Sequence, residues 1–221
     1  DIFHTSESEI GQIYMPWSIY HWLETFVLLR DELGAERRAS WETGLRLAYD
    51  GLARQYQQPR VHNIPTWDSM SLVRGAQIFG EPEWDRVGRA QMRLVMAHQT
   101  PDGFWPEGSG PTYGYNLVYI HALGLYHAFT GDAQARQCLA RATAFHGTLT
   151  YPDGVGVETI DGRQRYHHGV NPSGWTGFSQ TAMGRRLVSL QTANLLSKPG
   201  NLVPHLASYL QHGEQGPEAA L

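Results

Sequence analysis

The fold is decided between residues 99 and 121, which read QTPDGFWPEGSGPTYGYNLVYIH. Four Gly and three Pro lie in residues 100–114, so this part predicts a loop. The residues from Tyr115 onward are mostly apolar and predict a helix. Loops with aromatic rings and a charge often contact ligands, so we expect this one to form a wall of a binding cleft. The side chains concerned are Phe104, Trp105, Glu107, Tyr113 and Tyr115.

Composition and charge restrict the class of protein. The chain has 221 residues, 41% of them hydrophobic, which is enough for one globular domain over residues 1–221 or for part of a larger one. A formal net charge of -4 with 17% charged residues offers no basic surface for nucleic acid. No apolar stretch approaches the roughly 18 residues of a membrane span. The lone Cys138 excludes an internal disulfide and a multi-cysteine zinc site.

The two ends of the sequence bear on its origin. It begins at Asp1 without an initiator Met or a charged-then-apolar leader, and it ends in a polar stretch after His212. We therefore expect a processed chain or a fragment of a larger protein. Export to the periplasm or out of the cell is compatible with such processing.

Helical periodicity recurs along the chain and predicts four pairs of helices. The pairs are 17–33 with 36–56, 67–79 with 82–98, 115–129 with 133–146, and 178–196 with 202–211. Gly34, Gly80 and Gly131 separate the members of the first three pairs, and each is predicted to form a tight turn. These glycines are 46 and 51 residues apart, a spacing typical of stacked helical hairpins.

Long connections alternate with these tight turns, at residues 57–65, 99–114 and 148–177. Long loops that all follow the second helix of a hairpin should gather on one face. We therefore predict an all-α fold of stacked helical hairpins that form an (α/α) toroid around a central cleft. The hairpins are too few to close a ring, so we expect an incomplete toroid. The run Pro101-Asp-Gly103 is echoed by Pro152-Asp-Gly154, which predicts equivalent turns after successive outer helices.

The segment Gln99-Thr-Pro-Asp-Gly103-Phe-Trp105 resembles the Gln-x-x-x-Gly-x-Trp repeat of triterpene cyclases, which are also α/α toroids. The Asp-x-Asp-Asp motif with which those cyclases protonate their substrate is absent from this sequence. The resemblance therefore implies architecture only, in which a stacked turn ties neighbouring hairpins together.

Residues 63–132 resemble the α/α-toroid polysaccharide lyases of the alginate lyase and heparinase II/III type. The resemblance is carried by Asn63 and the Trp67-Asp-Ser-Met run, Asp102-Gly, Glu107-Gly, Tyr113-Gly-Tyr115-Asn and Gly131-Asp132. It implies that Tyr115 transfers the proton and that Asn63 binds the uronate carboxylate. Ile64 stands where that family has a His, and no Arg lies in the loop just before Tyr115.

The chemistry of β-elimination explains why an Asn and a Tyr suit such a site. The proton removed from C5 of a uronic acid lies beside a carboxylate, whose negative charge makes that proton poorly acidic. An Asn or a protonated His bonded to the carboxylate stabilises the charge that develops. A Tyr, whose ordinary pKa is about 10, can act as the base if cations or a helix N-terminus lower that pKa. The same phenol can protonate the departing oxygen, and we expect no cofactor.

Histidines and loop aromatics complete the candidate site. His62 and His168 are candidates to polarise the carboxylate or to take the proton, beside Tyr115 and Asn63. Rings and charged groups in or near the long loops are candidates for substrate binding, with packing or solvation as the alternative for each. They are Trp67, Trp105, Glu107, Tyr113, Arg165, His167 and Trp175. A metal site of Glu158 with His167 and His168 is disfavoured, because adjacent His side chains point apart.

Two other functions stay open. Glycoside hydrolases also use α/α toroids and need two carboxylates about 5 to 9.5 Å apart, for which Glu107 could pair with Asp68, Asp153 or Glu158. Helical hairpin stacks also bind proteins through a concave face. The Tyr and Asn placement favours a lyase acting on an acidic polysaccharide or oligosaccharide. The uronic acid, the linkage and the oligomeric state stay open.

Overall fold

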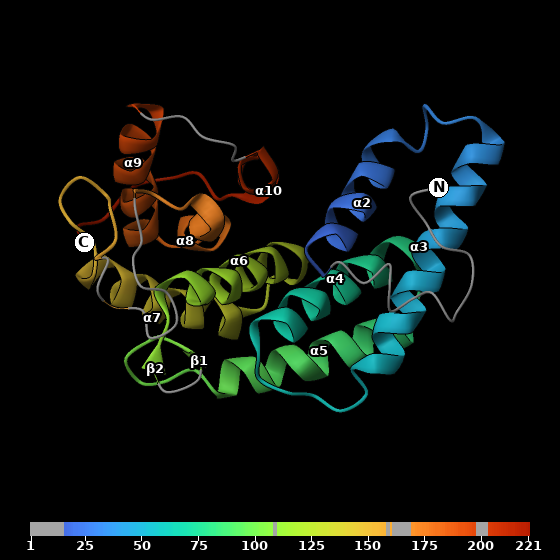
Figure 1. Cartoon of the computed structure of the whole chain (residues 1–221), viewed down its shortest axis with the longest axis horizontal. Helices are drawn as coiled ribbons and strands as arrows, with labels where there is room; N and C mark the ends of the chain where they lie inside the picture. Colours follow the sequence, from blue (N-terminus) through green and yellow to red (C-terminus); the bar gives the residue numbers. More distant parts are fainter. Residues whose placement is uncertain (1–15, 108–109, 158–159, 161–168, 198–202) are drawn as a thin grey trace. The chain divides into compact units, whose positions relative to one another are not determined.

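The computed structural model describes residues 16–107, 110–157, 160, 169–197 and 203–221. These residues are mostly helical, and their only sheet is one pair of two-residue strands, β1 (Pro106–Glu107) and β2 (Gly110–Pro111) (Figure 1). The predicted all-α class is therefore confirmed. Within this described part of the chain, none of the helices combines the length and the hydropathy needed to cross a bilayer.

Two compact units divide the chain, Asp1–Leu94 and Val95–Leu221. The helices of the first unit are α2 (Pro16–Leu29), α3 (Ala35–Gln55), α4 (Asn63–Phe79) and α5 (Pro82–Ala97), whose last turn belongs to the second unit. In the first unit, α2, α3 and α4 pack against one another. Apolar side chains at helical spacing form their shared core, as the periodicity predicts. They include Leu23, Phe26, Leu45, Tyr49, Leu52, Leu72 and Trp84.

Two of the three predicted glycine turns are confirmed. Gly80 ends α4 with a φ of 73°, and Gly131 ends α6 (Tyr113–Thr130) with a φ of 69°. Glycine adopts this left-handed conformation without the steric cost that a Cβ imposes. The prediction for Gly34 is wrong in detail, because α2 ends at Leu29 rather than at residue 33. Gly34 has a φ of -59° and is the N-cap of α3.

The second unit continues with α6, α7 (Ala133–Thr148), η2 (Pro172–Gly174), α8 (Trp175–Ser179), α9 (Ala182–Ser197) and α10 (Val203–His212). Both α7 and α8 pack against α6, and α9 packs against α7 and α8. The predicted uninterrupted helix over 178–196 is wrong, because the chain leaves α8 at Ser179 and begins α9 at Ala182. The side chain of Thr181 accepts a hydrogen bond from the Gly184 N–H at 3.0 Å and so caps the new helix.

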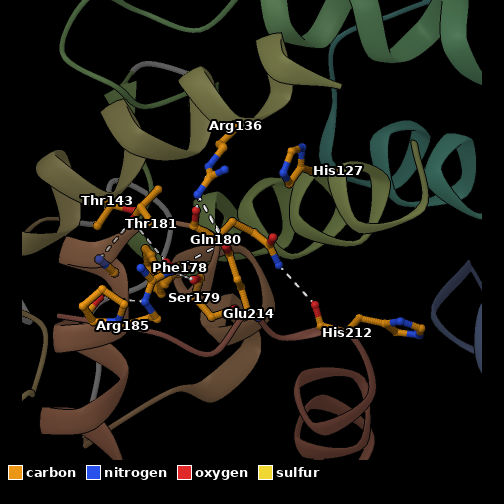
Figure 2. A network of polar contacts seen from close by, with 12 residues as sticks. His127, Arg136, Thr143, Phe178, Ser179, Gln180, Thr181, Arg185, His212 and Glu214 are labelled. Atoms are coloured by element: carbon orange, nitrogen blue, oxygen red, sulfur yellow. Dashed lines mark hydrogen bonds and ion pairs between the residues drawn. The ribbon is translucent and has the colours of Figure 1, made fainter. Parts of the chain in front are cut away.

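Polar contacts hold the turn between α8 and α9 (Figure 2). Arg136 of α7 donates to the carbonyl oxygen of Gln180 at 3.1 Å. The Gln180 side-chain amide donates to the carbonyl oxygen of His212 at 3.2 Å. Arg185 of α9 donates to the carbonyl oxygen of Ser179 at 2.8 Å. Side chains distant in sequence therefore stabilise a break that the local pattern does not show.

Glycines also allow α6 and α8 to touch through their backbones. A Cβ added at Gly177 of α8 would lie 2.1 Å from the carbonyl oxygen of Ile120. A Cβ added at Gly124 of α6 would lie 2.4 Å from the Cα of Gly177. No larger residue fits at either position without moving one helix, so α8 is held directly on α6.

The two Pro-Asp-Gly turns have the same hydrogen-bond pattern. In the first, the Thr100 N–H donates to the carbonyl oxygen of Phe104 at 2.9 Å. In the second, the Tyr151 N–H donates to the carbonyl oxygen of Val155 at 2.8 Å. The two turns are therefore structurally equivalent, as their sequences predict.

Both turns also press a glycine onto a helix backbone. Gly103 has a φ of 100°, and a Cβ there would lie 2.3 Å from the carbonyl oxygen of Arg141 in α7. Gly154 has a φ of 86°, and a Cβ there would lie 2.8 Å from the backbone nitrogen of Gln191 in α9. The turn after α5 thus packs on α7, and the turn after α7 packs on α9.

Alanine substitutions at three glycines of the second unit separate steric contact from backbone strain. Gly103→Ala introduces both, so the free energy of unfolding should fall by about 2 to 3 kcal/mol or more. Gly131→Ala meets no atom within 4 Å and has only the strain of a positive φ, which costs about 1 kcal/mol. Gly110→Ala introduces neither a steric contact nor a strained φ, so its free energy of unfolding should stay within about 0.5 kcal/mol of that of the parent. Urea unfolding followed by circular dichroism measures all three, and equal losses at Gly103 and Gly110 would contradict this packing.

Candidate active site

The side chain of Asn116 fixes the loop between α5 and α6. Its amide nitrogen donates to the carbonyl oxygens of Trp105 at 2.9 Å and Thr112 at 3.1 Å. Its amide oxygen accepts from the Trp105 N–H at 2.8 Å. Asn116 is fully buried, so these bonds are shielded from water and the loop is tied to the first turn of α6.

Trp105 belongs to the core of the second unit. Its side chain is fully buried and stacks on Tyr119, with 5.2 Å between the ring centroids and 8° between the ring planes. Its indole N–H donates to the carbonyl oxygen of Val95 at 2.8 Å. Packing, the alternative given for Trp105, accounts for this buried ring, and substrate binding by Trp105 stays an untested prediction. The ring anchors the loop.

Glu107 lies in β1 and is also buried, at 5% exposure. One of its carboxylate oxygens accepts from the Tyr119 hydroxyl at 2.9 Å. Burial, together with the nearby charge of Glu107, raises the pKa of Tyr119 well above its ordinary value. Tyr119 therefore keeps its proton and serves as a donor to the carboxylate.

Tyr113 is the first residue of α6 and is packed against the third long loop. Its ring centroid lies 4.6 Å from that of His146, and a Cβ at Gly156 would lie 2.5 Å from its hydroxyl oxygen. Burial raises the pKa of Tyr113 to about 12, against the lowering effect of a hydrogen bond with Thr150. The ring is buried, so packing accounts for Tyr113, and its contact with substrate stays an untested prediction. Tyr113 joins α6 to the second Pro-Asp-Gly turn.

Tyr115 lies in the first turn of α6 and is half-buried, in contrast to the buried Tyr113. The first turn of a helix presents backbone N–H groups and the positive end of the helix dipole. Tyr115 is the more exposed of the two tyrosines at the start of α6.

The predicted partner, Asn63, also stands in the first turn of a helix. Asn63 is the first residue of α4 and is buried, whereas His62 is the exposed N-cap. The carbonyl oxygen of His62 accepts from both the N–H and the hydroxyl of Thr66, at 3.1 Å and 2.7 Å. Asn63 lies in the first unit and Tyr115 in the second.

Trp67 joins an aromatic cluster that packs α4 on α2. Its ring centroid lies 5.5 Å from that of Tyr20, 5.9 Å from that of His21 and 6.1 Å from that of Trp17. Trp67 is 3% exposed, so packing accounts for its position, and substrate binding by Trp67 stays an untested prediction. Trp17, which the periodicity predicts to be in the core, is 41% exposed at the edge of this cluster.

Trp175 is the last of the predicted aromatic contacts that the structure describes. Its side chain is buried, and its indole N–H donates to the side-chain oxygen of Gln191 at 2.6 Å. Trp175 therefore has a packing role in this unit, and its predicted contact with substrate stays untested. The remaining candidates, Arg165, His167 and His168, lie outside the described residues, as does Glu158.

In the part of the chain that the structure describes, no group of three or more His, Cys, Asp or Glu side chains is placed to hold a metal ion. Comparison with protein-family models, with curated proteins and with solved structures gives no significant match to this chain. The function is therefore inferred from its own residues.

Two residues that position the loop, Asn116 and Tyr119, were not among the predicted site residues. The signal for Asn116 is a polar amide at the start of an otherwise apolar helix, directly after the candidate base Tyr115. Tyr119 follows Tyr115 by four residues and so lies one turn further along the helix. Nothing local in the sequence indicates that its hydroxyl meets Glu107.

Asn116→Ala should release the loop without disturbing the helices. It removes three hydrogen bonds and leaves buried backbone groups of Trp105 unpaired, so the free energy of unfolding should fall by about 2 to 4 kcal/mol. Amide hydrogen exchange should show a loss of protection at the Trp105 N–H. Gln134→Ala, at an exposed position of α7, is the control and should leave that protection unchanged. Persistent protection at Trp105 in the Asn116 variant would show that other contacts hold the loop.

The buried phenol of Tyr113 should make the protein sensitive to alkali. Below pH 10 the phenol is protonated in both states, and its contribution to stability is complete. Between pH 10 and about 12 the unfolded chain loses this proton while the folded chain keeps it, so stability falls. Tyr113→Phe should reduce the loss of stability between pH 9 and 11 by about 1 kcal/mol relative to the parent. Urea unfolding at both pH values measures the difference, and parallel losses in the two proteins would contradict it.

Proposed function

We propose that the protein is a polysaccharide lyase that cleaves a uronic-acid-containing polysaccharide by β-elimination. Tyr115 removes the C5 proton and then protonates the departing glycosidic oxygen. Asn63, with His62 or His168, neutralises the uronate carboxylate. The observation that carries the proposal is the half-buried position of Tyr115 in the first turn of α6, beside a loop in which Trp105 and Tyr113 are buried.

The neighbours of Tyr115 support a preorganised base. Asn116, the next residue, ties the preceding loop to α6 through three hydrogen bonds. Tyr113, two residues earlier, is packed against His146 of α7. A reactive group gains most from its surroundings when its own position is held by packing and by hydrogen bonds.

The repeated hairpins support an incomplete (α/α) toroid as the architecture of this lyase. In the second unit, α6 with α7 and α8 with α9 are successive hairpins, joined by short turns at 131–132 and 180–181. The glycine turns after α5 and α7 each pack on the next outer helix. In our proposal this arrangement places the long loops around one cleft.

The position of Glu107 favours the lyase over a glycoside hydrolase. A general acid must reach the glycosidic oxygen, yet Glu107 is 5% exposed and is bonded by the Tyr119 hydroxyl. Of its candidate partners, Asp68 is buried in the first unit and accepts from Tyr56 at 2.7 Å. Asp153 is exposed in the third long loop. Tyr115 is therefore the more accessible proton carrier.

Tyr115→Phe tests the assignment directly. The substitution removes the proton carrier and keeps the ring, so turnover should fall by about 10²- to 10⁴-fold while substrate still binds. The ultraviolet absorbance of the conjugated double bond that β-elimination creates, measured on a panel of uronate polymers, is the readout. Glu107→Gln is the matched variant and should slow turnover much less.

Three results would replace the proposal. A larger effect of Glu107→Gln, with new reducing ends but no absorbance, would indicate a hydrolase. Binding of the polymers without any cleavage by the parent would indicate a binding module. Unchanged turnover in both variants would show that neither residue is catalytic, and the catalytic group should then be sought in the loop that contains His168. The helical circular-dichroism signal of each variant must match that of the parent.

A further inference from the structure

A pocket of about 310 Å³ lies in the first unit, where the loop after α3 enters α4. Its lining residues are Gln55, Arg60, Val61, His62, Ile64 and Pro65. This volume is at the lower end of the range for ligand pockets, so it suits a group about the size of one sugar. Two of the lining side chains, Arg60 and His62, can carry positive charge, and none carries a negative charge.

The backbone at Arg60 is held by a buried glutamine. Gln91 of α5 is fully buried, and its side-chain oxygen accepts from the Arg60 N–H at 2.8 Å. Its side-chain nitrogen donates to the Arg60 carbonyl oxygen. A single side chain therefore satisfies both backbone groups of Arg60, and the wall of the pocket is rigid at this residue.

The guanidinium group of Arg60 is oriented as well. It lies 5.9 Å from the centroid of the Tyr56 ring, whose hydroxyl donates to the buried Asp68 at 2.7 Å. Cation–π contact of this kind favours one orientation of the side chain. Among the described residues no carboxylate pairs with Arg60, whereas Arg74 and Arg89 each form an ion pair. The donors of Arg60 are thus available to an anion in the pocket.

We infer that this pocket binds the carboxylate of an acidic sugar, with Arg60 as the main donor. The planar guanidinium matches a carboxylate through two parallel N–H···O bonds, which a Lys cannot reproduce. His62 and Gln55 supply further hydrogen-bonding groups for the carboxylate or for ring hydroxyls. The inference rests on the proposed function for the choice of a uronic acid. It adds a carboxylate-binding residue that the sequence did not indicate, three residues before Asn63 in the chain.

Arg60→Gln should weaken binding of a short uronate oligosaccharide by about 10- to 100-fold, the range for loss of a charge-assisted hydrogen bond. Isothermal titration calorimetry at low salt measures the dissociation constant for oligomers of galacturonate, glucuronate and mannuronate. Arg60→Lys keeps the positive charge but lacks the two parallel N–H donors of the guanidinium. Its affinity should lie between those of the parent and of Arg60→Gln. The carboxyl-reduced oligosaccharides should bind parent and variants equally weakly. The Arg60 side chain is exposed, so the variants should retain the parent's circular-dichroism signal.

Arg38→Gln is the matched control, because it removes the same charge from an exposed position. Arg38 lies in the first turn of α3, about 25 Å along that helix from Gln55 at a rise of about 1.5 Å per residue. Binding by this variant should equal that of the parent. Equal weakening by Arg38→Gln and Arg60→Gln would overturn the inference, because it would indicate a general effect of net charge.

The remaining outcomes separate this inference from the proposed function. One outcome is that the parent binds uronate oligomers without cleaving any, while Arg60→Gln no longer binds them. That result would support the carboxylate site at Arg60 and contradict the proposed lyase activity. If the parent cleaves a uronate polymer and Arg60→Gln changes neither KM nor the dissociation constant, the lyase activity is supported. The carboxylate-binding role of Arg60 is then contradicted. If the parent binds no uronate oligomer, the pocket assignment is also wrong. If inorganic sulfate competes with uronate at equal affinity, the pocket binds oxyanions in general, and the assignment to a sugar carboxylate is wrong.

Discussion

The contact between a glycine turn and a helix backbone is the constraint on which the second unit depends. Gly103 rests on the carbonyl oxygen of Arg141, and Gly154 rests on the backbone nitrogen of Gln191. Since neither glycine has a Cβ, backbone atoms alone set the distance between turn and helix. The first turn packs on α7 and the second on α9, so the same kind of contact recurs within the second unit.

The start of α6 shows how structure and candidate chemistry share one short segment. Tyr113 and Asn116 are buried and hold the two long loops, through packing on His146 and through hydrogen bonds to the backbone of Trp105. Tyr115 lies between them and is half-buried. Its neighbours restrict its backbone while its phenol remains accessible. Loops that carry function are often positioned in this way by a rigid scaffold.

The start of α4 follows a similar logic in the first unit. Gln91 is fully buried, and the oxygen and nitrogen of its side-chain amide are both hydrogen-bonded to the backbone of Arg60. The loop before Asn63 therefore has little freedom. A buried polar side chain is favourable only when its polar atoms are hydrogen-bonded, as those of Gln91 are. The side chain of Arg60 is then held beside the Tyr56 ring rather than by a carboxylate. Among the described residues no carboxylate pairs with Arg60, so its guanidinium suits an anionic ligand.

The sequence by itself determined the all-α class, most helix positions and the turns at Gly80, Gly131, Gly103 and Gly154. Periodicity and a positive φ are local properties, and they can be read from neighbouring residues. Only the tertiary structure decided which aromatic residues are buried, because the burial of Trp105, Tyr113, Trp67 and Trp175 depends on distant elements. Long-range hydrogen bonds likewise decided the break at Gln180 and the pocket at Arg60, whose partner Gln91 is 31 residues away. A sequence pattern records which side chains are present, but burial and hydrogen bonding depend on the packing of segments far apart in the chain.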